Sequence, residues 1–108
     1  MNESKRYAWS WKIKDECLDE YVRMHLNPWP EIMKEHSTAG IRNYTIFQNG
    51  NQFFYYFECD DVEAAFDYLS KSEECQRWND ITSKMVEGSF DLAEEHPIEF
   101  LTEAFRLD

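Results

Sequence analysis

The dipeptide Asn49-Gly50 constrains the fold of this chain more than any other feature, because it separates two strand-like segments. Asn-Gly strongly favours the two-residue turns that join antiparallel strands. The segment 41–48 precedes it, and the segment 53–59 after it reads FFYYFEC. Aromatic side chains on both faces of the second segment indicate a strand that is covered on both sides. We therefore predict a β-hairpin at this point.

A strand and two helical segments are expected before the hairpin. Residues 7–14 alternate between bulky and small or polar side chains, which predicts a strand with one bulky face. Asp15 is a suitable cap for a helix that runs to about Asn27. Pro30 suits the first position of a further helix, which we expect through Glu35.

The chain after the hairpin is expected to form two helices and a final strand. Either Asp60 or Asp61 can cap the first helix. Its apolar positions recur at helical spacing: Val62, Ala65, Phe66 and Leu69. The second helix is expected over 73–86, followed by a loop over 87–97 and a short strand over 98–107.

This order of elements, β-α-β-β-α-β, predicts an α+β fold of the ferredoxin-like type, also called split βαβ. A length of 108 residues suits one domain, which we place at 1–108. Helices cover only one face of such a sheet, so the other face needs a partner chain, a ligand cavity or both. We therefore expect a homodimer.

Charge and cysteine content exclude several classes of function. The net charge is −11, with 22 acidic and 11 basic residues, which argues against nucleic acid or an anionic membrane surface as a partner. Cys17, Cys59 and Cys75 are odd in number and form no CxxC pair, so neither a disulfide framework nor a zinc site is expected. Free thiols suit a reducing compartment. With no apparent signal peptide or membrane span, we expect a cytoplasmic location.

The candidate site begins with Tyr21 and His25, which are four residues apart and therefore share one face of a helix. The imidazole of His25 titrates near neutral pH when unperturbed. Trp29 follows between Pro28 and Pro30, two residues that end or bend a helix. A phenol, an imidazole and an indole within nine residues suit a small polyhydroxylated ligand.

Seven short motifs carry a resemblance to a known family. They are RYAW (6–9), KIK (12–14), EYxxxH (20–25), WPE (29–31), GIRNYTIF (40–47), CQRW (75–78) and ExFxLD (103–108). In order and spacing, the chain resembles the L-rhamnose mutarotase family along almost its whole length. The resemblance implies a dimeric α/β barrel of ferredoxin-like subunits. It also implies that a free monosaccharide is the substrate, that its α and β anomers are interconverted, and that neither a metal nor an organic cofactor takes part.

The resemblance also assigns roles to individual residues. His25 matches the family's proton donor, and Tyr21 and Tyr44 match its substrate-binding tyrosines. Trp78 matches the first member of a Trp-Trp pair that contacts the sugar, but Asn79 replaces the second tryptophan. The amide of Asn79 can donate and accept hydrogen bonds. We expect it to contact the substrate, and the preferred sugar need not be L-rhamnose.

Mutarotation opens a hemiacetal and closes it again on the other face, which requires one oxygen to lose a proton and another to gain one. A group that titrates near pH 7 suits this general acid–base work. We expect His25 to protonate the ring oxygen. Tyr21 or Tyr44 is then either the partner base or an orienting group.

The remaining aromatic and imidazole side chains receive no catalytic role at this stage. Trp9 and Trp11 are expected in the core, because the bulky face of their strand should pack on the helices. His36 and His96 are assigned no function. Arg106 stands where many family members carry a histidine.

Two other functions remain open. The same fold could serve a small cofactor-independent monooxygenase, whose site would be an apolar slot. Alternatively, the chain could be a non-catalytic sugar-binding module in which His25 only forms a hydrogen bond. We expect the lining of a cavity on the uncovered sheet face to separate these possibilities, since converging His, Tyr and Asn groups would favour a sugar.

Overall fold

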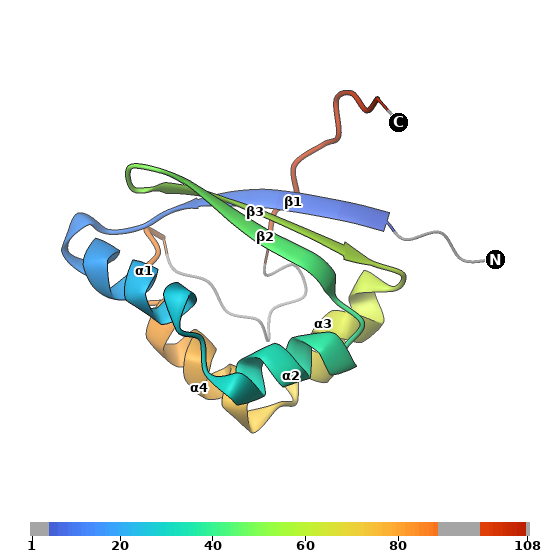
Figure 1. Cartoon of the computed structure of the whole chain (residues 1–108), viewed down its shortest axis with the longest axis horizontal. Helices are drawn as coiled ribbons and strands as arrows, with labels where there is room; N and C mark the ends of the chain where they lie inside the picture. The colour runs from blue at the N-terminus through green and yellow to red at the C-terminus, as the bar shows by residue number, and fades with distance from the viewer. Residues whose placement is uncertain (1–4, 89–97, 108) are drawn as a thin grey trace.

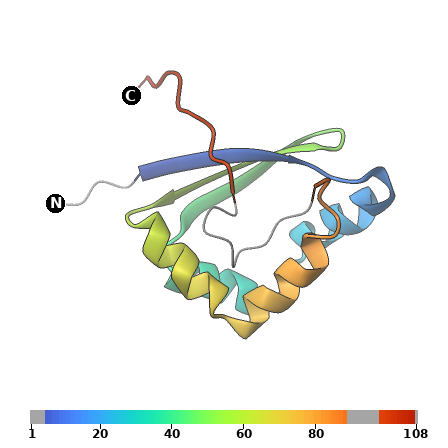
Figure 2. The same ribbon diagram turned by 180° about the vertical axis from the view of Figure 1, so that it is seen from behind.

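The structure is a computed structural model, and it describes residues 5–88 and 98–107. The strands are β1 (Lys5–Lys12), β2 (Arg42–Asn49) and β3 (Gln52–Cys59). The helices are the 3-10 turn η1 (Asp15–Cys17), α1 (Leu18–Leu26), α2 (Pro30–Thr38), α3 (Val62–Ser70) and α4 (Glu73–Thr82). All four α-helices lie on one side of the sheet, with α1 and α2 nearer the viewer in Figure 1 and α3 and α4 nearer in Figure 2.

The sheet is antiparallel and has the order β1-β3-β2, with β3 in the centre. Alternate residues of β1 and β3 face the helices and form the core. Trp9, Tyr55 and Phe57 are each at most 3% exposed. Each such side chain contributes about 1.5–3 kcal/mol when it is fully buried, so this face fixes the register of the strands.

The hairpin prediction is confirmed. Asn49 pairs with Gln52, and the backbone of Gly50 has φ +63°, a conformation that glycine adopts without steric cost. Two further predictions on helix starts are also confirmed. Asp61, rather than Asp60, caps α3 by accepting a hydrogen bond from the Ala64 amide, and Pro30 is the first residue of α2.

The β2–β3 pairing contains a bulge that was not expected from the sequence. Arg42 pairs with Glu58 and Thr45 with Tyr56, so β2 has one extra residue between these pairs. Asn43 adopts φ +52° there. Because a bulge shifts the alternation of side chains, Tyr44 turns to the inner face and lies over the ring of Phe57, with centroids 6.1 Å apart.

The predicted covering of residues 53–59 on both sides is met within this chain on one side only. The helices cover only the inner face, and Phe54 on the outer face is 42% exposed. Its neighbour Phe47 on β2 is 63% exposed. Aromatic residues on both faces indicated double coverage, but within this chain no described element packs on the outer face.

The predicted final strand over 98–107 is not formed, since none of these residues has strand geometry. One backbone hydrogen bond, from the Leu101 amide to the Ala8 carbonyl, joins this segment to the edge of β1. Leu101, Phe105 and Leu107 are 55%, 82% and 84% exposed. A strand is stabilised largely by packing of its side chains, and these three find little to pack against in this chain. Phe100 alone of the aromatic residues in the segment packs on the core, with its ring centroid 5.0 Å from that of Tyr7.

Two helix boundaries also differ from prediction. Asp15 does not cap α1; its carboxylate instead accepts a hydrogen bond from Asn51. The helix expected over 73–86 ends at Thr82, because Val86 pairs with Ile13 beyond the end of β1. The expected loop 87–97 lies mostly outside the described residues. None of the described helices is long and apolar enough to cross a membrane.

Candidate active site

A cavity lies between the inner face of the sheet and the helices. Its lining includes all five of the residues that the sequence nominated: Tyr21, His25, Tyr44, Trp78 and Asn79. The cavity volume is about 80 Å³, several times what one water molecule requires. The expectation of a cavity on the uncovered sheet face is therefore wrong, because this one lies on the side that the helices cover.

His25 is half-buried on α1, with its Nδ1 atom 2.8 Å from the Tyr21 carbonyl oxygen one turn earlier. A carbonyl oxygen only accepts hydrogen bonds, so Nδ1 carries the proton. In the neutral imidazole, the lone pair is then on Nε2. Burial lowers the pKa of His25 from its ordinary value of 6.5, and the backbone hydrogen bond offsets part of that effect. His25 is therefore a neutral base at pH 7.

Tyr21 is 2% exposed, and its ring centroid lies 4.3 Å from that of His25. Its hydroxyl forms a 2.5 Å hydrogen bond with the hydroxyl of Tyr55, on β3. Burial raises the pKa of Tyr21 to about 12, although this hydrogen bond acts in the opposite direction. The phenol therefore stays neutral at pH 7 and is suited to hydrogen bonding rather than to removing a proton.

Trp78 and Asn79 come from α4, which Ser72 caps by accepting a hydrogen bond from the Cys75 amide. The Trp78 ring meets His25 edge-on, with centroids 5.5 Å apart. Trp29, between its two prolines, also meets Trp78 edge-on, with centroids 5.0 Å apart. Trp78 therefore supports the imidazole, while the half-buried Asn79 adds an amide to the cavity wall.

The cavity lining also includes residues that were not nominated as site residues from the sequence, Tyr55, Trp9 and His36 among them. Tyr55 lies on β3, where it pairs with Trp9, and it lines the cavity from the inner face of the sheet. Trp9, expected in the core, is indeed 3% exposed but also lines the cavity. Its Nε1 atom is buried without a hydrogen-bond partner among the described residues. His36, which was assigned no role from the sequence, lines the same cavity from α2.

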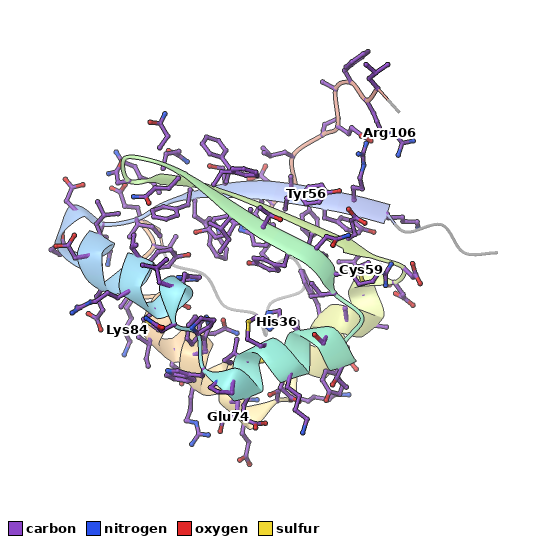
Figure 3. All side chains as sticks on the ribbon, viewed as in Figure 1. His36, Tyr56, Cys59, Glu74, Lys84 and Arg106 are labelled. Atoms are coloured by element: carbon purple, nitrogen blue, oxygen red, sulfur yellow. The ribbon has the colours of Figure 1, made fainter. Side chains whose placement is uncertain are left out.

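The other residues considered from the sequence are Arg106, Trp11 and His96. Figure 3 places Arg106 in the C-terminal segment, on the side of the sheet away from the helices. Trp11 is half-buried and lines the cavity, whereas His96 lies outside the described residues. In residues 5–88 and 98–107, no group of three or more His, Cys, Asp or Glu side chains is arranged to hold a metal ion.

Comparison with known proteins assigns the chain to a family. A family model described as L-rhamnose mutarotase matches residues 6–107. The chain belongs to the L-rhamnose mutarotase family. It is accordingly an isomerase of the mutarotase type. The resemblance that the sequence motifs suggested is thereby confirmed.

Individual L-rhamnose mutarotases align along most of the chain. The enzyme of Lactiplantibacillus plantarum is 32% identical over 100 residues, which cover 89% of this chain and 91% of that protein. The enzyme of Oceanobacillus iheyensis is 29% identical over 107 residues, which cover 96% and 99%.

A crystal structure of an L-rhamnose mutarotase from Formosa agariphila superposes with a TM-score of 0.75 at 20% identity, over 97% of this chain and 100% of that one. At this level of identity, the likeness concerns the fold alone, and it confirms the predicted α+β ferredoxin-like class.

Proposed function

We propose that this protein interconverts the α and β anomers of a neutral aldopyranose, with L-rhamnose as the first candidate, and that His25 transfers the proton. The observation that carries this proposal is the cavity in which a neutral imidazole lies among phenol, indole and amide groups. Such a wall can bind both the hydroxyl groups and the C–H faces of a sugar.

His25 can serve both oxygens of the reaction, since the anomeric and ring oxygens are bonded to the same carbon. The neutral Nε2 accepts the proton of the anomeric hydroxyl while the bond between C1 and the ring oxygen breaks and the C1 carbonyl forms. The imidazolium then gives this proton to the ring oxygen. After rotation about C1–C2, the reverse steps close the ring on the other face, and His25 returns to its neutral state.

The tyrosines have a different part in this proposal. Because burial raises the pKa of Tyr21 to about 12, its phenol donates or accepts a hydrogen bond and does not act as a base. Tyr44 and Asn79 are proposed as further contacts to sugar hydroxyls, and Trp78 as the aromatic face for sugar C–H groups. The proposed site needs neither a metal nor an organic cofactor.

We also propose that the protein works as a cytoplasmic homodimer made of single-domain chains, which together form the dimeric α/β barrel. The uncovered outer face of the sheet supports this, since it exposes Phe47 and Phe54. The C-terminal segment adds exposed Phe105 and Leu107. A second copy is the partner expected to cover these apolar side chains.

The experiment that tests the function is NMR magnetisation exchange between the two anomers of L-rhamnose, with and without the protein. L-Fucose, L-arabinose and D-galactose follow under the same conditions. Faster exchange with L-rhamnose is the expected result, and faster exchange with another sugar only would assign Asn79 to a change of specificity. No acceleration with any sugar would contradict the proposal and favour a sugar-binding module.

The monooxygenase alternative receives no support from the cavity lining. Such a site was expected to be an apolar slot, whereas His25, Tyr44 and Asn79 bring polar groups into this one. The family membership also favours the mutarotase.

A further inference from the structure

His36 reproduces the local geometry of His25 on a different helix. It is half-buried on α2, and Figure 3 shows it on the side of that helix that faces the sheet. Its Nδ1 atom lies 2.7 Å from the Ile32 carbonyl oxygen one turn earlier. Since that oxygen only accepts, Nδ1 carries the proton and the lone pair of the neutral ring is on Nε2. His36 therefore brings a second imidazole acceptor to the cavity.

The two histidines stand at opposite ends of a continuous row of contacts along the cavity wall. The Tyr21 ring packs on His25, and its hydroxyl bonds to that of Tyr55. Tyr55 stacks on Trp9 with centroids 4.8 Å apart. The row continues from Trp9 to Tyr44 at 6.0 Å and from Tyr44 to His36 at 5.9 Å. A ligand that lies along this wall thus meets a histidine at each end.

The imidazole of His36 favours a ligand group that is an uncharged hydrogen-bond donor. Burial lowers the pKa of His36 below its ordinary value of 6.5, so the ring is uncharged at pH 7. A lone pair in a partly buried position attracts an O–H group and repels a carboxylate. A sugar hydroxyl has the donor that this acceptor requires, whereas a uronic acid would present the wrong charge.

We propose that His36 is a specificity-determining residue, whose Nε2 atom accepts a hydrogen bond from a sugar hydroxyl remote from the anomeric centre. This inference rests on the proposed binding of an aldopyranose, and it extends that proposal to the class of substrate. The substrate is a neutral aldopyranose that keeps its hydroxyl at the position facing His36. An analogue without that hydroxyl leaves the buried acceptor unpaired and binds more weakly.

The test combines a variant of His36 with a series of monodeoxy sugars. Dissociation constants of L-rhamnose and each of its monodeoxy analogues are measured by calorimetry for the wild type and for His36→Leu. KM and kcat come from anomer exchange. Lys34→Leu is the matched control, because Lys34 is exposed on the same helix and lies outside the cavity lining. Circular dichroism and thermal melting establish that each variant is folded.

We expect His36→Leu to weaken the binding of L-rhamnose about three- to tenfold, the range that corresponds to one hydrogen bond. KM should rise by a similar factor, with kcat changed less. For one monodeoxy analogue, the wild type and the variant should bind equally, because the partner of His36 is already missing. His36→Gln keeps an acceptor and should recover most of the affinity, and Lys34→Leu should bind like the wild type.

Equal affinity of the wild type and His36→Leu for L-rhamnose would overturn the inference. The inference would also be overturned if His36→Leu lost the same affinity for every monodeoxy analogue, since His36 would then not bond to one particular hydroxyl. The two proposals fail separately. If the wild type binds sugar with the expected pattern but accelerates no anomer exchange, the mutarotase proposal is wrong and the role of His36 stands.

Discussion

At the scale of single residues, helical spacing was sufficient to predict that Tyr21 and His25 lie together. The i, i+4 relation of Tyr21 and His25 predicted that they share a face, and their rings are indeed in contact. His36 was missed because no motif surrounds it. A signal was present, however, since Ile32 is buried one turn earlier and helical spacing therefore turns His36 inward. Tyr55 was missed because it is one aromatic residue among several in β3.

Tyr55→Phe should destabilise the protein, because it leaves the buried hydroxyl of Tyr21 without its partner. We expect a loss of about 1–3 kcal/mol in the free energy of unfolding, measured by urea denaturation. Tyr68→Phe is the control, since its hydroxyl bonds to Glu35 on the exposed surface and its loss should cost less than about 0.5 kcal/mol. Equal losses in the two variants would contradict a buried hydroxyl pair.

The pH dependence of the reaction should reflect His25. The reactive form is the neutral ring, and burial lowers its pKa below 6.5. The midpoint of the acidic decline in kcat should therefore lie below pH 6.5, because protonation of the ring removes the lone pair. Tyr21, with a pKa of about 12, should add no decline at moderately alkaline pH. Anomer exchange at saturating sugar measures this profile.

His36 titrates in the same direction, so the profile needs a second measurement in His36→Leu. An acidic decline that persists in this variant assigns it to His25. Its disappearance would transfer the proton-accepting role to His36.

At the scale of the elements, local chemistry predicted where the chain turns and where helices begin. Asn49-Gly50 forms the predicted turn and Asp61 forms a predicted helix cap. Both structures could be predicted because each depends on only a few neighbouring residues. The direction of Tyr44 was not predictable, because it results from a bulge in the pairing of β2 with β3. Strand pairing is a long-range property, which also explains why the strand expected over 98–107 was wrong.

Asp61→Ala should show whether Asp61 stabilises α3 as a helix cap or contributes only a surface charge. Removing the carboxylate that accepts from the Ala64 amide should cost about 0.5–2 kcal/mol of the free energy of unfolding. Asp60→Ala is the matched control, because it removes an exposed ion pair with Arg42, and such pairs contribute about 0–1 kcal/mol. If thermal or urea unfolding shows the larger loss for Asp60→Ala, the assignment of the cap is wrong.

At the scale of the whole molecule, the sequence predicted one helix-covered sheet face and the need for a partner on the other. The covered face holds the cavity, whose lining comes from the sheet and helices of this chain. The uncovered face was expected to carry the cavity, and here the sequence was misleading. A hydrophobic pattern identifies surfaces to be covered, but it does not say whether a ligand or a chain covers them.

The proposed homodimer should depend on the C-terminal segment. Phe105→Glu places a charge on a side chain that is 82% exposed in the single chain, and it should shift the protein from dimer to monomer. Met33→Glu is the control, since Met33 is 59% exposed on the helical side. Light scattering after size-exclusion chromatography gives the mass of each variant. A monomeric wild type, or a dimer that tolerates Phe105→Glu, would contradict this arrangement.

The role of His25 in proton transfer is tested most directly by the rate of anomer exchange of L-rhamnose with the wild type and with His25→Gln. Glutamine retains hydrogen bonding but does not transfer a proton near pH 7. We predict that exchange catalysed by the variant is slower by about 10²–10⁴-fold, while its dissociation constant for the sugar changes little. Exchange at the wild-type rate in a folded His25→Gln variant would contradict the account, because the proton would then move without His25.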